Sequence, residues 1–229
     1  MGRLERHDPT TSSPRDIYHL LASLVAPRPI AWVSTESDQG VVNLAPFSFF
    51  TISSGAPPSV IFVIEDDKDT LKNLRANPKL VVNLPSESFA EAVEATAIEF
   101  PPQEAEMDRI GLVGTTIMQG FPPAVDNVSA ALVCELDSIH AHKRNSIVIA
   151  NVQGLFVDPT IFVDGRIDFG LYRPLGRLSG RYSTVGSAFK VARPKYVEVQ
   201  ARGARADDKL LEPLVRSELR VFKCLFQKE

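Results

Sequence analysis

The sequence predicts an all-β dominated fold with a few helices, arranged as a closed or half-closed antiparallel barrel. Short runs rich in β-branched and aromatic residues, about eight in number, are separated by turn residues. Signatures of doubly wound nucleotide-binding sheets and of hydrolases are missing, since no GxGxxG follows a strand and no P-loop, HExxH or GxSxG occurs. With 229 residues, 44% of them hydrophobic, the chain is expected to form one large domain with appendages.

The N-terminal segment, residues 1–16, is rich in polar residues and proline, and we interpret it as an arm that can dock on a partner subunit. A short helix is predicted over Tyr18–Val25. Pro27 and Pro29 end it, because proline lacks a backbone donor and disfavours helical geometry in the residue before it. The domain is therefore expected to begin at residue 17.

The next part of the chain predicts five short strands, bounded by the turn sequences SDQG, SSGAPP, EDDK and NP. These strands are Ile30–Thr35, Val41–Asn43, Phe47–Ser53, Ser59–Ile64 and Leu80–Leu84. A helix is expected over Lys68–Asn77, with Leu71 and Leu74 on one face and Asp69 or Thr70 as the N-cap.

The second half continues the same pattern. A helix is predicted over Ser88–Ala97, and Phe100–Gly120 reads as a long loop with one helical turn, a length that compact domains usually keep for function. Two strands, Ser129–His140 and Ser146–Val157, are expected to pair as antiparallel neighbours. We assign residues 17–186 to the main domain and residues 187–229 to a charged C-terminal extension that packs on the barrel or on a partner subunit.

Composition excludes several classes of function. A formal net charge of −3 and a pI near 5.9 give no field that would attract nucleic acid. Cys134 and Cys224 are far apart and have no metal-ligand spacing, so we expect reduced thiols and no metal site. No apolar run has the length of a signal peptide or a membrane span, which predicts a cytoplasmic protein without membrane attachment.

The segment Val42–Thr51, VNLAPFSFFT, is the strongest candidate for a binding site. Asn, Pro and Ser are poor strand formers, and here they interrupt an aromatic run, as expected where backbone groups and hydroxyls face a ligand. In the alternative interpretation, Pro46 marks a bulge at a sheet edge and the phenylalanines are ordinary core residues.

The sequence KDTLKN is a second candidate. Lys68 and Thr70 at a helix start can place an ammonium, a hydroxyl and free backbone N–H groups around one phosphate. The alternative is an exposed helix cap with a solvated lysine.

Together these segments carry a resemblance. The ordered set PRPIAWVST, NLAPFSFF, KDTLKN, VVNLP, the EATA-to-FPP segment and RPLGRLSGRY resembles the flavin reductase-like family of FMN-binding split barrels, over Pro27–Tyr182. Its central motif, N-x-A-P-[FY]-S-[FY]-F, is fairly specific. The resemblance implies a six-stranded split β-barrel, usually a homodimer, with the flavin lying between the barrel and the partner subunit.

The resemblance also implies roles for individual residues. Lys68 and Thr70 would hold the flavin phosphate, together with Ser34 or Arg28. Gly180 and Tyr182, in the late RLSGRY, would approach the flavin. The motif residues that would line the ring and ribityl chain are Asn43, Ala45, Pro46, Ser48, Phe49 and Phe50. Backbone N–H groups of the NLAPFS segment would donate to the reduced ring, and Trp32 is expected in the core, with flavin contact as the alternative.

The function that the resemblance implies is an NAD(P)H-dependent flavin reductase. It would use FMN, with FAD as a second option, and NADH or NADPH as the electron donor. Reduced flavin would pass to a partner enzyme such as a monooxygenase, or the protein would reduce a small acceptor itself. No catalytic side chain is expected, because hydride transfer is cofactor chemistry. Two alternatives remain open: a non-enzymatic FMN-binding electron carrier or flavin store, and a split barrel that binds another ligand such as haem or a deazaflavin.

Overall fold

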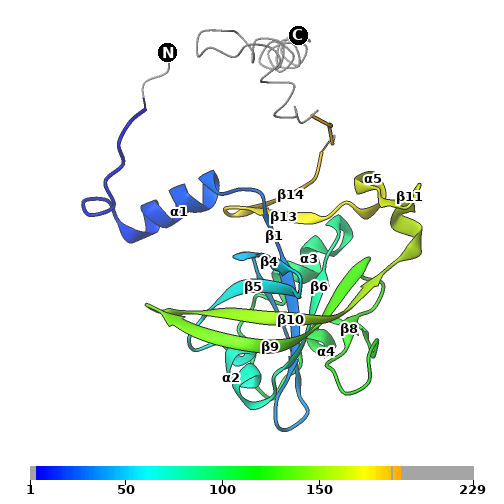
Figure 1. The fold of residues 1–229 in the computed structure, drawn as a ribbon. Helices are drawn as coiled ribbons and strands as arrows, with labels where there is room; N and C mark the ends of the chain where they lie inside the picture. The colour runs from blue at the N-terminus through cyan, green and yellow to red at the C-terminus, as the bar shows by residue number, and fades with distance from the viewer. Residues whose placement is uncertain (1–3, 187, 192–229) are drawn as a thin grey trace. The chain divides into compact units, whose positions relative to one another are not determined.

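The computed structural model describes residues 4–186 and 188–191 (Figure 1). All helices and strands reported below lie in the compact unit that ends at Ser187. The predicted C-terminal extension, 187–229, falls almost entirely outside the described residues. Within the described part of the chain, no helix is both long and apolar enough to span a membrane.

A seven-stranded antiparallel sheet forms the centre of the fold, in the order β3-β2-β6-β9-β10-β5-β4. Its strands are β2 (Ala31–Glu36), β3 (Val42–Phe47), β4 (Phe50–Gly55), β5 (Pro58–Glu65), β6 (Lys79–Leu84), β9 (Ala130–His142) and β10 (Asn145–Val157). The two edge strands, β3 and β4, are consecutive in the chain and are separated by Ser48 and Phe49 alone. With β3 and β4 taken as one bent strand, the sheet is a six-stranded barrel, and the predicted fold class is confirmed.

The strand boundaries in the central motif differ from the prediction. The strands expected at Val41–Asn43 and Phe47–Ser53 are instead β3, which runs through Pro46, and β4, which begins at Phe50. The N–H of Leu44 points away from β2 and donates to Glu106. Pro46, two residues further on, has its nitrogen on the same outward side, where the missing donor breaks no ladder bond.

The helices begin and end close to the predicted positions, with two corrections. Helix α1 (Pro14–Leu24) starts inside the expected arm, because Ser13 caps it by accepting the N–H of Asp16 and Pro14 occupies the first turn. The N-cap of α2 (Asp69–Ala76) is Lys68, without a side-chain cap bond, and not Asp69 or Thr70. The predicted helix over Ser88–Ala97 is η1 (Glu87–Phe89) followed by α3 (Ala90–Ala95), and the turn in the long loop is α4 (Glu106–Ile110).

Smaller elements complete the unit. A three-stranded sheet, in the order β1-β13-β14, joins the start of the barrel to the late RLSGRY segment. The remaining elements are β1 (Arg28–Pro29), β7 (Gly114–Thr115), β8 (Ala124–Val125), η2 (Pro159–Ile161), β11 (Phe162–Val163), β12 (Arg166–Ile167), α5 (Phe169–Tyr172), β13 (Leu175–Leu178) and β14 (Arg181–Thr184). The long β9–β10 hairpin, green in Figure 1, confirms the predicted antiparallel pair.

The core has two main parts. Inside the barrel, side chains such as Phe62 and Val82 pack with Leu71 and Leu74, so the predicted apolar face of α2 packs against the barrel core. Beneath α3 and α4, Trp32 is fully buried, and its Nε1 donates to Thr96 Oγ1 at 2.8 Å. The core interpretation of Trp32 is therefore confirmed.

Asn83 is a polar residue at full burial between strands. Its Nδ2 donates to the Trp32 carbonyl at 2.9 Å and to Ser34 Oγ at 3.0 Å, and its Oδ1 accepts the N–H of Val125 at 2.9 Å. One side chain thereby ties β6, β2 and β8 together.

Glu106 fixes the outer edge of β3. This carboxylate is 8% exposed and accepts the Leu44 N–H at 2.8 Å. Burial raises the pKa of Glu106 above its ordinary value, and the charge of Asp69 acts in the same direction, while the hydrogen bond from Leu44 opposes both.

Replacing Asn83 by alanine should lower the free energy of unfolding by about 2 to 3 kcal/mol, because buried backbone groups lose their partner. Urea unfolding measures this. The control is Asn151→Ala, which removes an exposed bond to Asp137 and should cost less than about 0.5 kcal/mol. Equal losses of unfolding free energy in the two variants would show that the buried hydrogen bonds of Asn83 stabilise the fold no more than an exposed bond does.

Glu106→Gln tests the buried carboxylate. A carboxyl whose pKa is raised by folding binds its proton more readily in the native state, so the wild type loses stability as pH rises from the ordinary value of 4.5 through the raised one. Glutamine keeps an acceptor for Leu44 and does not ionise. We expect the variant to be more stable than the wild type at about pH 7, with the difference shrinking toward zero below about pH 4.5. A difference that stays constant with pH in urea unfolding would contradict this.

Candidate functional site

Two surface hollows meet at Pro46 and Ala97 beside the bend between β3 and β4. The larger, called here the Lys68 hollow, has a volume of about 320 Å³ and lies between β3, the start of α2 and the loop after α3. The smaller, the Tyr182 hollow, has a volume of about 180 Å³ and lies between β1, the bend, α3 and the β13–β14 hairpin. Because they share these two lining residues, the two hollows adjoin.

The fold brings most of the predicted site residues to these hollows. The Lys68 hollow is lined by Asn43, Ala45, Pro46, Lys68 and Thr70, among others. The Tyr182 hollow is lined by Arg28, Pro46, Ser48 and Tyr182, among others. Four predicted residues, Ser34, Phe49, Phe50 and Gly180, line neither hollow. Segments that are distant in the sequence therefore share one site.

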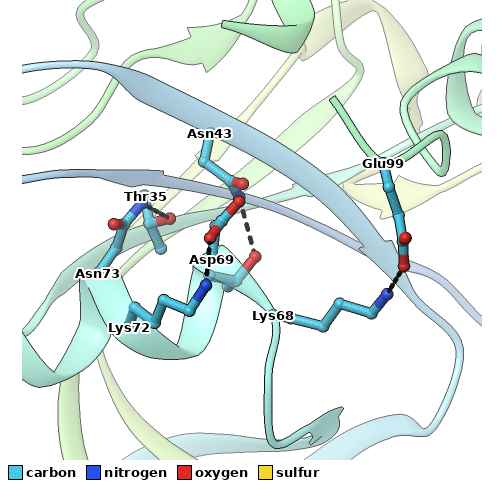
Figure 2. Close-up of polar contacts among 8 residues, drawn as sticks. Thr35, Asn43, Lys68, Asp69, Lys72, Asn73 and Glu99 are labelled. Carbon is cyan, nitrogen blue, oxygen red and sulfur yellow. Dashed lines mark hydrogen bonds and ion pairs between the residues drawn. The ribbon is translucent and has the colours of Figure 1, made fainter. Parts of the chain in front are cut away.

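Lys68 lies at the end of its hollow where α2 begins. Its ammonium forms an ion pair with Glu99, which comes from the loop after α3 (Figure 2). The hydrogen bond to Glu99 raises the pKa of Lys68, so the lysine is fully charged at neutral pH. Because no side chain caps α2, its first amides add positive potential at the same place.

Thr70 and Asn43 hold α2 against the barrel. Asn43 Nδ2 donates to Thr70 Oγ1 at 2.8 Å, and Asn73 Nδ2 donates to Thr35 Oγ1 at 3.2 Å (Figure 2). Thr70 is 1% exposed, so its hydroxyl supports Asn43 and does not face solvent. Asn43 is half-buried and is the member of this pair that a ligand can reach.

Ser34 and Arg28, the additional phosphate candidates, are placed differently from the prediction. Ser34 is fully buried, and its hydroxyl accepts a hydrogen bond from Asn83. Arg28 is 6% exposed, and its Nη1 donates to the carbonyls of Ala22 and Val25 at the end of α1. Both side chains are committed to the fold in this conformation, because a buried polar group must be paired with its neighbours.

The Tyr182 hollow contains a polar cluster that the sequence analysis missed. Glu94 accepts hydrogen bonds from Tyr182 Oη and from Arg177 Nη1, the latter at 2.7 Å. The Arg177 guanidinium carbon lies 4.5 Å from the centre of the Tyr182 ring. Arg177 belongs to the quoted RPLGRLSGRY, but nothing in the sequence linked it to Glu94, which lies 83 positions earlier.

The cluster fixes the protonation state of its members. Burial raises the pKa of Tyr182 to about 12, and the bond to Glu94 acts in the same direction. The hydrogen bonds from Tyr182 and Arg177 lower the pKa of Glu94. At neutral pH the tyrosine is therefore a hydrogen-bond donor held in place by a charged carboxylate.

The aromatic residues of the motif divide between core and surface. Phe47 stacks on Phe62 with ring centres 5.8 Å apart, and Phe50 packs against the same barrel core. Both side chains therefore serve the core, as in the alternative interpretation, and Phe47 also lines the Lys68 hollow. Phe49, at the bend, is 45% exposed, and the Arg28 guanidinium lies 5.7 Å from its ring centre.

The backbone donors expected along the whole motif are mostly occupied. Alternation along β3 turns the N–H groups of Asn43, Ala45 and Phe47 toward β2, Leu44 bonds to Glu106, and Pro46 has no N–H. The amides of Ser48 and Phe49 at the bend are the ones that lie outside both strands. The backbone donors of the motif left for a ligand are therefore at the bend, where Ser48 lines the Tyr182 hollow.

No group of three or more His, Cys, Asp or Glu side chains that could hold a metal ion occurs among the described residues. The arrangement has a cation and a helix start in the Lys68 hollow, an apolar wall of Ala45, Pro46 and Ala97, and in the Tyr182 hollow a tyrosine whose O–H is bonded to Glu94. Such a site suits an elongated ligand with an anionic tail and a flat head.

Comparisons with known proteins agree with this geometry. The family described as "Flavin reductase like domain" matches residues 23–176, more than half of the chain. An uncharacterized protein of Aquifex aeolicus (strain VF5) is 34% identical over 172 residues, covering 72% of this chain and 88% of its own.

Solved structures show the same barrel. Nitrilotriacetate monooxygenase component B from Bacillus cereus has a TM-score of 0.78 and 26% identity, covering 83% of this chain and 100% of its own. The 2-nitrobenzoate 2-nitroreductase of Pseudomonas fluorescens has a TM-score of 0.77 and 26% identity, covering 84% and 98%. With the six-stranded barrel and the two motif segments in one hollow, these matches show that the chain belongs to the flavin reductase-like family of split-barrel flavoproteins.

Proposed function

We propose that this protein is an NAD(P)H-dependent flavin reductase that binds FMN across the Lys68 and Tyr182 hollows. The observation that carries the proposal is the meeting of Asn43–Phe47 and Lys68–Thr70 in one hollow, with the uncapped start of α2 at its end. These segments are the ones that the family resemblance assigned to flavin.

The residues at the Lys68 end fit a phosphate. The Lys68 ammonium and the amides of Asp69 and Thr70 offer charge-assisted and helix-end hydrogen bonds. The Asp69 carboxylate is neutralised by Lys72, at 2.8 Å, so it does not cancel the positive end of α2. A monophosphate would therefore meet the Lys68 ammonium, which is paired with Glu99, and the first amides of α2 in this hollow.

The residues toward the bend fit a flat ring. Ala45, Pro46 and Ala97 form an apolar wall, and the amides of Ser48 and Phe49 are free of the strands. Tyr182 remains protonated and donates its single O–H to Glu94, with Arg177 over its ring, so that it offers a ligand an oriented ring and an accepting oxygen. When bound, the flavin supplies the hydride chemistry, and these side chains bind and orient it.

The neighbouring surface supports FMN over FAD. A third hollow, of about 290 Å³, adjoins the Lys68 hollow through Asn43, Asp69, Lys72, Pro102 and Glu106. Its carboxylates are Asp38, Asp69, Glu104 and Glu106. A second phosphate placed there would face these carboxylates without Lys68, which does not line that hollow, whereas a single phosphate at Lys68 would have the ammonium and the start of α2 to offset the carboxylates around it.

The relatives support two ways of using reduced flavin. One is named component B of a monooxygenase, which supports transfer to a partner monooxygenase, and another is named a nitroreductase, which supports direct reduction of a small acceptor. We also propose a homodimer. Phe49 lies exposed at the bend, next to Ser48 of the open Tyr182 hollow, and Ile52 lies exposed on β4; a second subunit would cover these apolar side chains.

Turnover tests the function directly. We expect the purified protein to oxidise NADH or NADPH when FMN is added, and a visible spectrum of flavin when FMN is bound. Bound flavin without turnover would favour an electron carrier or flavin store. A haem or deazaflavin spectrum would contradict the assignment of the ligand.

Lys68→Met tests the phosphate contact. We expect FMN affinity to fall roughly ten- to a hundredfold, since a charge-assisted bond contributes about 1.5 to 3 kcal/mol, while riboflavin, which lacks the phosphate, should change by less than about twofold. Flavin fluorescence titration measures both. Lys79→Met, which removes the same charge from a lysine beside Phe121, should leave both affinities unchanged. Equal losses of affinity for FMN and riboflavin would show that Lys68 does not bind the phosphate.

A further inference from the structure

The ion pair between Lys68 and Glu99 lies in the lining of the Lys68 hollow. Lys68 is the N-cap of α2, Glu99 lies on the loop after α3, and the two side chains reach toward each other (Figure 2). The two residues are 31 positions apart, so the fold rather than local sequence brings them together. The cation assigned to the ligand is thus already paired with a carboxylate of the protein.

This pair is easy to break. The Glu99 side chain is 82% exposed and that of Lys68 is 36% exposed, and exposed ion pairs contribute little net stability because water solvates both partners well. Glu99 extends from a loop next to Pro101 and Pro102 and makes its hydrogen bond to Lys68 alone among the described residues. It can therefore leave Lys68 without disturbing the barrel.

The other charged groups around Lys68 do not replace Glu99. Glu65 and Asp67, in the turn before α2, act on the pKa of Lys68 through space, more weakly than the hydrogen bond to Glu99. Asp69 is paired with Lys72, and Glu106 bonds to Leu44. Glu99 is thus the carboxylate that occupies the position at which an incoming phosphate would meet Lys68.

We propose that Glu99 is an exchangeable counter-ion that competes with the flavin phosphate for Lys68 and thereby weakens FMN binding. The inference rests on the proposed function. Without flavin, Glu99 holds the lysine and neutralises it. When FMN binds, its phosphate takes the lysine and Glu99 turns to water. The consequence is a flavin that exchanges readily, as a substrate does, and is not held permanently.

Glu99→Gln tests this proposal by flavin fluorescence titration. We expect FMN to bind about three- to tenfold more tightly than to the wild type, because the competing anion is gone. Riboflavin affinity should stay within about twofold of the wild-type value, since riboflavin has no phosphate to pair with Lys68. The gain for FMN should shrink as salt is raised from about 0.01 to 1 M, since screening weakens exposed charges. Glu91→Gln, an equal change of charge on the exposed side of α3, should change neither affinity.

The double variant Lys68→Met/Glu99→Gln separates competition from direct repulsion. If Glu99 acts through Lys68, then Glu99→Gln should change FMN affinity by less than about twofold in the Lys68→Met background. An equal gain in both backgrounds would show that Glu99 repels the ligand directly, and an unchanged FMN affinity in the single variant would show that it does neither. Either result overturns the proposal. Failure of the wild type to bind FMN would instead contradict the proposed function.

Discussion

The geometry of the site depends on how the edge strand β3 is held. An edge strand presents unpaired backbone groups on one side, and here Glu106 accepts the N–H of Leu44 on that side. From the strand's own side chains, Asn43 donates to Thr70 and so fixes the start of α2. These two bonds fix the position of β3 relative to the start of α2. Pro46 is tolerated further along β3 because its nitrogen, which carries no hydrogen, faces away from β2.

The same arrangement explains why several polar residues serve the fold and not the ligand. Arg28, Ser34 and Thr70 are buried, and each has a protein partner. A buried polar group without a partner costs more than an exposed one, so such residues are committed before any ligand arrives. The groups left for a ligand lie at the surface of the hollows: Lys68, the amide of Ser48 at the bend, and the ring and oxygen of Tyr182, whose O–H is held by Glu94.

Ion pairs at the surface of the two hollows control how strongly an anionic ligand can bind. Lys68 is balanced by Glu99, and Arg177 by Glu94. The two pairs differ in how firmly their side chains are held. Arg177 also stacks on the Tyr182 ring and donates from Nε to the Ser179 carbonyl at 2.9 Å, while Glu99 extends from a loop into solvent. The Arg177–Glu94 pair holds the Tyr182 ring in one orientation, and the looser Lys68–Glu99 pair leaves its cation available for exchange.

The sequence by itself determined the barrel class, the pairing of the two long strands and the helix over the KDTLKN segment, because alternation and turn residues are local properties. The family resemblance of its motifs supplied the site residues, and eight of the twelve line the two hollows. Tertiary structure decided the rest. The partners of Lys68, Tyr182 and Leu44 lie 31, 88 and 62 positions away, and whether a side chain such as Ser34 or Thr70 faces a ligand or a neighbour depends on burial. Both contact across the chain and burial are consequences of packing, which no local pattern encodes.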